Sequence, residues 1–426
     1  MGYNKVPARV EAKRMPGKQE GDLSRRDFLK AAGAAGAGSL LAATGKLSGQ
    51  DKSEPEAPSK EPAVPTRVLG KTGARVTIIC LGGEFDTSTN QLVLKQALKH
   101  GVTFWDTAPN YLNGQSQQGL GTFFEKNPDA RKQIFLSCKA EQRDPQGMTL
   151  QLNDSLKTLR TDHIDLYMLH ALDGPDELSD WRDGWKDWAE KAKKSGKIRF
   201  FGLSMHFNVE DSMLAAAKLG WVDAVMGMYN FRIMSSDKMK AAADACAKAK
   251  VGLIAIKSMA YRQTWQPTKA EWDLINGYKG KGYNSFQARL KLVWENQQIA
   301  SVCVLMPNTT ILTCNTAASM DKTKLTAGDR RLLEQYARET CSSYCAGCSR
   351  ICSQAVGGKV PISDIMRYVM YYGAYGDRDR ARRLFAGLPA RQRRQLARVD
   401  YSAAEERCPR HMPIGRLMKE AQELLA

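Results

Sequence analysis

From about residue 74 onward, short runs of β-branched and apolar residues alternate with longer amphipathic segments that carry Lys and Glu. Parallel strands covered by helices produce this alternation. The apolar runs predict eight strands, at Arg75–Leu81, Thr103–Thr107, Ile134–Lys139, Ile164–His170, Arg199–Ser204, Ala224–Tyr229, Gly252–Lys257 and Ser301–Met306. The amphipathic runs predict helices at Asn90–His100, Gln117–Glu125, Leu150–Leu159, Asp180–Ser195, Val209–Leu219, Asp237–Lys250 and Ser285–Gln297. Eight such units in roughly 250 residues favour an α/β fold of the (β/α)8 TIM barrel type.

The alternative is an open, doubly wound sheet that binds a dinucleotide. A G-x-G-x-x-G segment after the first strand would favour that fold, and none follows it in this sequence. We therefore divide the chain of 426 residues into a signal region (1–46), a linker (47–65), the barrel (66–320) and a mainly helical, cysteine-rich C-terminal domain (321–426).

The N-terminal region has the features of an export signal. Ser24–Lys30 contains paired arginines, and a small, weakly apolar stretch follows at Ala31–Thr44. This arrangement resembles a twin-arginine signal, although an ordinary amphipathic helix is the alternative. The resemblance implies export to the periplasm or another extracytoplasmic space. An uncleaved signal would be the chain's only contact with the membrane, as a tether. The polar, proline-rich stretch before the barrel is typical of an extended linker.

Ionisable residues occupy the ends of several predicted strands. Asp106, Lys139 and His170 lie inside or directly after otherwise apolar runs, and Tyr111 follows the second strand closely. Burying such groups is costly unless they are paired. Since the C-terminal strand ends of a barrel converge on one mouth, we expect these side chains to meet there.

The order Asp-Thr-Ala-x-x-Tyr, Lys, Leu-His and Gly-x-Ser along the strands resembles the aldo-keto reductase family. The resemblance implies that Tyr111 is the general acid and that Lys139 lowers its pKa. It implies further that Asp106 holds Lys139 and that His170 orients the substrate carbonyl or shares its proton. A nearby ammonium stabilises a phenolate, which supports this division of roles. Taken singly, His170 could equally be a satisfied core histidine and Asp106 a strand-end cap.

The same resemblance implies a nicotinamide cofactor, NADH or NADPH, bound by Ser204, Asn230 and Lys257. Two departures weaken that expectation. Met226 stands where the family has a Gln, and the segment Leu305–Ile311 lacks a basic residue for a 2′-phosphate.

The tail combines cysteines with an arginine-rich run. Its cysteines have short gaps and end in a distant Cys-Pro pair, which resembles a ferredoxin segment and implies one 4Fe-4S cluster. The expected ligands are Cys341, Cys345, Cys348 and Cys408, with Cys352 as the alternative. Disulfides and a zinc site are the competing interpretations. The five other cysteines are isolated and are expected to be buried free thiols, namely Cys80, Cys138, Cys246, Cys303 and Cys314.

The net charge of +18 is compatible with an acidic partner, an anionic membrane or nucleic acid. The arginine-rich run lies between Arg378 and Arg398, so it is either a docking face for an acidic redox partner or a solvated helical surface. Export argues against nucleic acid. The sequence predicts an exported oxidoreductase that interconverts a small-molecule carbonyl and alcohol and carries a 4Fe-4S cluster. The alternative is a non-catalytic binding or electron-transfer protein on a degenerate barrel.

Overall fold

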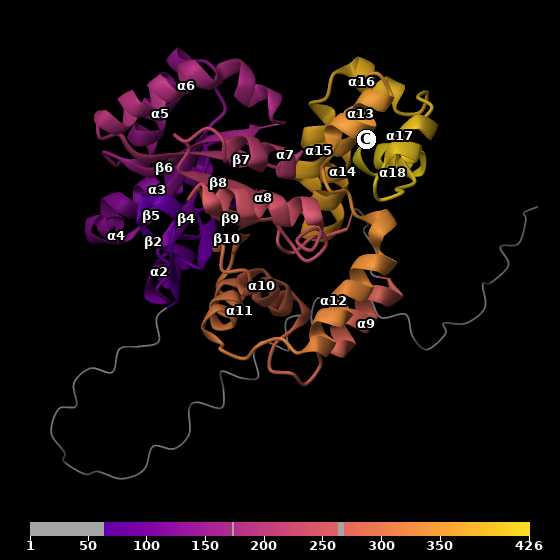
Figure 1. Ribbon diagram of the computed structural model, residues 1–426, viewed down its shortest axis with the longest axis horizontal. Helices are drawn as coiled ribbons and strands as arrows, with labels where there is room; N and C mark the ends of the chain where they lie inside the picture. Colours follow the sequence, from indigo (N-terminus) through magenta and orange to yellow (C-terminus); the bar gives the residue numbers. More distant parts are fainter. Residues whose placement is uncertain (1–63, 173, 263–267) are drawn as a thin grey trace, which may run out of the picture.

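The computed structural model describes residues 64–172, 174–262 and 268–426, so the predicted signal region and nearly all of the linker lie outside it. Its centre is a closed parallel barrel in which each strand pairs with the next and β10 pairs with β3. The strands are β3 (Ile79–Gly82), β4 (Phe104–Asp106), β5 (Phe135–Ala140), β6 (Ile164–Leu172), β7 (Ile198–Met205), β8 (Ala224–Met228), β9 (Gly252–Ile256) and β10 (Ile299–Leu305). The predicted eight-stranded barrel is therefore confirmed (Figure 1).

One predicted strand was wrong at its start. Arg75–Leu81 divides into β2 (Arg75–Thr77) and β3, and β2 pairs antiparallel with β1 (Thr66–Val68) outside the barrel. This hairpin closes the N-terminal end, where Val76 and Leu69 join the interior core. The turn requires Gly70, because a Cβ there would lie 2.3 Å from the Gly252 nitrogen. A short 3-10 helix, η2 (Gly70–Thr72), forms this turn.

The predicted helices return the chain along the outside of the barrel. They are α2 (Gln91–Lys99), α3 (Gln115–Lys126), α5 (Pro145–Leu159), α6 (Asp176–Lys194), α7 (Val209–Ala216), α8 (Asp237–Lys248) and α10 (Ser285–Glu295). Three helices in the barrel region escaped prediction, α4 (Pro128–Gln133), α9 (Lys269–Gly277) and α11 (Thr309–Met320). A continuous apolar core fills the space between strands and helices, which holds the strand ends in fixed positions.

The C-terminal region is helical and has its own core. It comprises α12 (Ala327–Glu339), η3 (Cys341–Ser343), α13 (Ser349–Ala355), α14 (Ile362–Met370), the π-helical turn η4 (Tyr371–Tyr375), α15 (Arg378–Ala386), α16 (Ala390–Gln395), α17 (Ser402–Arg407) and α18 (Ile414–Leu425). Helix α12 packs into the barrel core through Leu333 and Tyr336, whereas α13 to α18 share a separate core. Figure 1 shows α14 and α15 on the side of this region that faces the barrel.

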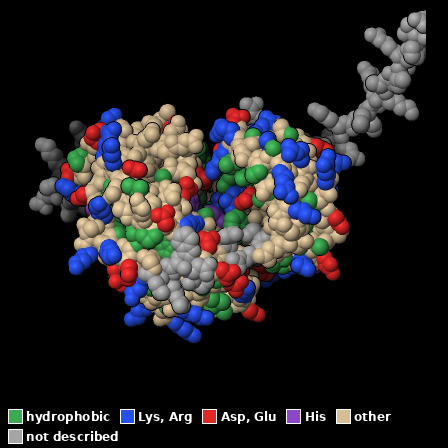
Figure 2. Space-filling model, turned by 90° about the horizontal axis from the view of Figure 1, so that it is seen from above, with side chains coloured by type: hydrophobic (Ala, Val, Ile, Leu, Met, Phe, Trp, Pro, Cys, Tyr) green, Lys and Arg blue, Asp and Glu red, His purple; other side chains and the backbone are tan. Residues whose placement is uncertain are grey.

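A hollow lies between two lobes, the barrel and the C-terminal helices that dock on it. Figure 2 shows histidine and Lys or Arg side chains inside this hollow. Within the described residues, we find no helix that is both long and apolar enough to span a bilayer.

Candidate active site

A cavity of about 430 Å³ occupies the barrel mouth. Its floor comes from the C-terminal strand ends, which supply Asp106, Lys139 and His170, and Tyr111 from the loop after β4 also lines it. Its roof comes from α14, η4 and α15 of the tail. The structure thus brings the four predicted catalytic residues together under a cover that the sequence did not predict.

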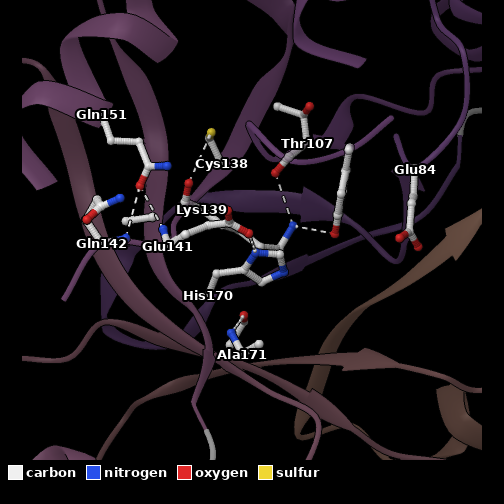
Figure 3. A network of polar contacts seen from close by, with 12 residues as sticks. Glu84, Thr107, Cys138, Lys139, Glu141, Gln142, Gln151, His170 and Ala171 are labelled. Atoms are coloured by element: carbon white, nitrogen blue, oxygen red, sulfur yellow. Dashed lines mark hydrogen bonds and ion pairs between the residues drawn. The ribbon is translucent and has the colours of Figure 1, made fainter. Parts of the chain in front are cut away.

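Asp106 and Lys139 form a buried ion pair at the centre of this floor. The Lys139 Nζ lies 2.6 and 2.5 Å from the two Asp106 carboxylate oxygens, and the side chains are 2% and 3% exposed. The ammonium also donates to the Thr107 carbonyl oxygen at 3.1 Å and to the Tyr111 Oη at 3.1 Å. Figure 3 shows Lys139 and His170 pointing into one space with Glu84 nearby. The pairing satisfies both charges and holds the ammonium beside the phenol, where four acceptors share its three N–H donors.

The protonation of Tyr111 differs from the expectation. Burial, followed by the charges of Asp106 and Glu84, raises the pKa of the phenol well above its usual value. The predicted lowering by Lys139 is therefore wrong as a net effect, because Asp106 neutralises that ammonium and burial disfavours the phenolate. Tyr111 is held as a neutral phenol, which is the form that donates a proton.

His170 is oriented by an acidic neighbour. Its Nδ1 lies 3.4 Å from a Glu141 carboxylate oxygen, and its ring packs edge-on against Tyr111 with 6.0 Å between centroids. Burial lowers the pKa of the imidazole, although Glu141 opposes this effect. A neutral ring that donates from Nδ1 to Glu141 has its lone pair on Nε2. His170 can therefore accept a hydrogen bond from a hydroxyl.

The three predicted cofactor residues have different surroundings. Ser204 and Lys257 line the cavity at the barrel mouth, which we call the catalytic cavity. The Ser204 hydroxyl accepts a hydrogen bond from the Ala171 nitrogen at 3.0 Å. Asn230 is fully buried, lines neither this cavity nor the next, and bonds to the Lys257 carbonyl and the Tyr344 hydroxyl. Its amide holds the backbone at the end of β9, and its predicted contact with a cofactor stays a prediction.

A second cavity of about 870 Å³ adjoins the first. It runs past Ser258 to Pro307 and the start of α11, where Asn308 caps the helix by accepting from the Ile311 nitrogen at 2.9 Å. Its volume is in the range of sites for drug-sized ligands and cofactors. Its only cationic lining residues in the described chain are Lys257, Arg367 and Arg380, and none of these lies near α11 in sequence.

The tail contributes residues that the sequence analysis missed. Arg380 of α15 forms an ion pair with Glu84, which follows β3, across 296 residues of sequence. Arg380 also lies over the Tyr371 ring, 4.3 Å from its centroid. Glu84 could have been found because it follows a predicted strand, as Asp106 does. Arg380 was hidden within a run of exposed arginines.

Four thiols converge on a third, small cavity in the tail. Cys345, Cys348, Cys352 and Cys408 line it together with apolar side chains such as Ile362 and Met366. Burial and the nearby Cys352 and Cys408 raise the pKa of Cys348 to about 11. The cavity measures about 20 Å³, which is near the room needed by one water molecule. A larger group would require the thiols to move apart.

Cys341 does not line this cavity, and its sulfur lies 3.9 Å from the Arg410 carbonyl oxygen. All ten cysteines are free, so the disulfide alternative finds no pair in the structure. Among the described residues, no three His, Cys, Asp or Glu side chains are grouped closely enough for a single metal ion. Cys345 also lines the second cavity, so it stands between the two spaces.

Comparisons with known proteins agree with this geometry. The Aldo/keto reductase family profile matches residues 78–271, and the profile of the TAT (twin-arginine translocation) pathway signal sequence matches residues 22–42. The uncharacterized oxidoreductase YrpG of Bacillus subtilis is 31% identical over 159 residues, which are 32% of this chain and 48% of that protein. The aldo-keto reductase yakc [NADP(+)] of Schizosaccharomyces pombe is 33% identical over 160 residues, 33% of this chain and 46% of that protein.

The chain spans about half the length of these curated relatives. Among solved structures, the holo form of the aldo-keto reductase AKR11C1 from Bacillus halodurans aligns with a TM-score of 0.55 and 19% identity. The alignment covers 67% of this chain and 98% of that one. This similarity concerns the fold.

Proposed function

Because this chain carries an aldo/keto reductase family domain and a twin-arginine signal sequence, we propose that it is an exported oxidoreductase that interconverts a small-molecule carbonyl and the corresponding alcohol. One observation carries the proposal: the Tyr111 hydroxyl lies 3.1 Å from the ammonium of Lys139, in one cavity with His170. This arrangement can move a proton to or from an oxygen atom of a bound substrate.

The proton chemistry follows from the charges around Tyr111. As a carbonyl is reduced, its oxygen becomes an alkoxide, a far stronger base than the carbonyl. The neutral phenol of Tyr111 then gives up its proton, and the ammonium of Lys139 stabilises the phenolate that forms. Asp106 keeps Lys139 charged and in place throughout. In the reverse direction, Nε2 of His170 accepts the hydrogen bond that orients the alcohol.

The residues present fit a nicotinamide dinucleotide, which when bound supplies or accepts the hydride. The second cavity has sufficient volume and opens beside Ser204 and Lys257, and the start of α11 offers backbone N–H groups that suit a phosphate. The lack of a cationic side chain at that end favours NADH over NADPH, because a 2′-phosphate needs such a partner.

Replacing Tyr111 with Phe tests the proposal. The loss of the general acid should reduce kcat for carbonyl reduction by about 10²- to 10⁴-fold. Tyr372→Phe is the matched control, because Tyr372 belongs to η4 but lies outside the cavity lining. Equal activity in the Tyr111 variant and the control would refute the role of Tyr111.

A second candidate function follows from Met226, which lines the cavity where the family has a Gln. If the barrel has lost its cofactor, the protein is a binding or electron-transfer protein. Fluorescence titration of the purified protein with NADH and with NADPH separates the two functions. If the protein binds neither dinucleotide, the result supports the binding or electron-transfer function.

For the tail, we propose that Cys345, Cys348, Cys352 and Cys408 hold one 4Fe-4S cluster. Their shared cavity supports this set, and it replaces the expected ligand Cys341 with Cys352. The sulfurs around a cube are farther apart than those around a zinc ion, so the four thiols would have to move apart to hold the cube. Its place beside the second cavity suits electron exchange with a ligand bound there.

Metal analysis of two variants tests the ligand set. The anaerobically purified protein should contain about four iron and four sulfide per chain, Cys352→Ser should lose most of both, and Cys341→Ser should keep them. Loss of iron only in the Cys341 variant would restore the first ligand set. Zinc without iron in the unmodified protein would refute the cluster.

We further propose that the protein acts outside the cytoplasm and exchanges electrons with an acidic protein. The exposed arginines of α15 and α16 support such docking. Substituting Arg25 and Arg26 with Lys should keep the protein in the cytoplasmic fraction, whereas substituting Lys18 and Lys30 with Arg should not. Export of the paired-lysine variant at the normal rate would contradict the assigned route.

A further inference from the structure

Arg380 and Glu84 line both large cavities and pair with each other there. Two further cationic side chains and one histidine also line both cavities and so mark the boundary between them. They are Arg367 of α14, Lys257 after β9 and His206 after β7. Two come from the barrel and one from the tail, so the group exists only when the tail is docked. Nothing in the proton chemistry of Tyr111 requires them.

Arg367 is held in place without a carboxylate. Its guanidinium lies over the Phe207 ring, 4.6 Å from the centroid, and no ion pair joins it to an acidic residue in the described chain. Among the cavity carboxylates, Glu84 pairs with Arg380 and also interacts electrostatically with Lys257, and Asp106 pairs with Lys139. Stacking on an aromatic ring fixes the plane of the guanidinium and leaves its N–H fork available.

The other carboxylates of the catalytic cavity also have partners. Glu141 contacts His170, and Asp364 has an interaction of its own. The residues that line both cavities therefore include three cations, Lys257, Arg367 and Arg380, against the single carboxylate of Glu84, which leaves an excess of positive charge at the boundary. A charge in a recessed site is costly without a partner, so an anionic ligand would be stabilised there.

Lys257 and His206 add two further signs of a ligand site. Lys257 has a left-handed backbone with φ of 56°, a strained conformation that the Asn230 amide holds by donating to its carbonyl oxygen. The Nδ1 of His206 is buried and has no hydrogen-bond partner within the described structure. Buried polar groups normally have a hydrogen-bond partner, so the unsatisfied Nδ1 of His206 indicates that a ligand could supply one there.

We propose that Arg367, Lys257 and His206 bind the anionic group of the substrate, and that the substrate is a small carbonyl compound carrying a carboxylate. The planar fork of an arginine matches a carboxylate with two parallel hydrogen bonds. The same cavity contains Tyr111 and His170, so one small molecule can place its carboxylate at the boundary and its carbonyl at the phenol. This inference rests on the proposed carbonyl reduction and identifies its substrate class.

A matched pair of probes tests the inference. Phenylglyoxylate and its methyl ester share the same ketone and differ in the negative charge. Hydrogen bonds to a charged group contribute about 1.5–3 kcal/mol, which corresponds to roughly ten- to 150-fold. We expect the unmodified protein to prefer the acid by about that factor in kcat/KM, and Arg367→Gln to lower the acid-to-ester ratio at least tenfold. Arg367→Lys should give an intermediate ratio, because it keeps the charge without the fork.

Arg383→Gln is the control, because Arg383 is an exposed arginine of the adjacent helix α15 and lines neither cavity. It should leave the ratio unchanged. An equal preference for acid and ester in the unmodified protein would overturn the inference and leave the proposed reduction standing. Should Arg367→Gln fail to fold, Lys257→Met provides the same comparison.

Calorimetric titration with phenylglyoxylate separates binding from turnover. Binding that needs Arg367 without any reduction would support the anion site and would count against the proposed reduction instead. The competing source of an anion is the pyrophosphate of a dinucleotide. If Arg367→Gln weakens NADH or NADPH binding and leaves the acid-to-ester ratio intact, the site belongs to the cofactor and the inference fails.

Discussion

Removing the negative charge of Asp106 should destabilise the fold strongly. Asp106 and Lys139 are 3% and 2% exposed, and the ammonium contacts both carboxylate oxygens. In Asp106→Asn, one of these oxygens becomes an NH₂ group that faces the ammonium. Breaking a buried ion pair on one side costs about 3–5 kcal/mol. At about 2–4 °C per kcal/mol for a domain of this size, the melting temperature should fall by roughly 6–20 °C.

The assay is unfolding by heat and by guanidinium chloride, followed by circular dichroism. Asp129→Asn is the matched control, because Asp129 pairs with Lys132 at 2.9 Å but the two side chains are 84% and 77% exposed. Exposed pairs contribute little, so this variant should unfold like the unmodified protein. The double variant Asp106→Asn/Lys139→Met should be more stable than Asp106→Asn alone, since it removes the uncompensated charge. The reasoning is refuted if Asp106→Asn matches the control or if the double variant recovers nothing.

Three further predictions concern the contact between tail and barrel. Gly347→Ala should destabilise this contact and reduce the iron content, because the added Cβ would lie 2.8 Å from the His206 carbonyl oxygen. Gly220→Ala is the control, because Gly220 has a similar φ and open space around it. Equal melting temperatures of the two variants would contradict this prediction. Burial, with Arg367 and Lys257, holds the pKa of His206 well below 6.5, so the unfolded chain binds a proton that the folded chain does not. Stability should therefore fall as pH drops below about 6.5, and His206→Asn should flatten the denaturant midpoints between about pH 7.5 and 5.5; an unchanged slope would count against this cause. Glu84→Gln should speed hydrogen exchange in α15 by removing the partner of Arg380, and exchange equal to that of the unmodified protein would show that the ion pair does not hold the tail.

The barrel and its catalytic group could be predicted because both depend on local patterns. Strands buried on both faces are apolar along their whole length, so an Asp or Lys at a strand end is conspicuous. The convergence of Asp106 and Lys139 then follows from the geometry of a barrel. The division of the first predicted strand into β2 and β3 could not be predicted from hydrophobicity, because the apolar run continues from Thr77 through Ile79 without a break.

The roof of the site could not be predicted from the sequence. Arg380 sits in a helix with other arginines, and only the docking of α15 distinguishes it from Arg383. The spacing of the tail cysteines predicted five candidate ligands, and the fold places Cys352 in the small thiol-lined cavity and Cys341 outside it. Asn230 was predicted to contact a cofactor because its position matched, and in the structure its amide holds the backbone. These contacts join residues far apart in the chain.

The roof also has a consequence for the order of events during synthesis. The last barrel strand ends at Leu305, whereas the tail residues that cover the mouth lie between Asp364 and Leu384. A nascent chain can close its barrel while the ribosome is still making the cover. Until the cover is added, water fills the mouth and screens the charges around Tyr111. The enclosed site therefore forms only after α14 and α15 have been synthesised and have docked on the barrel.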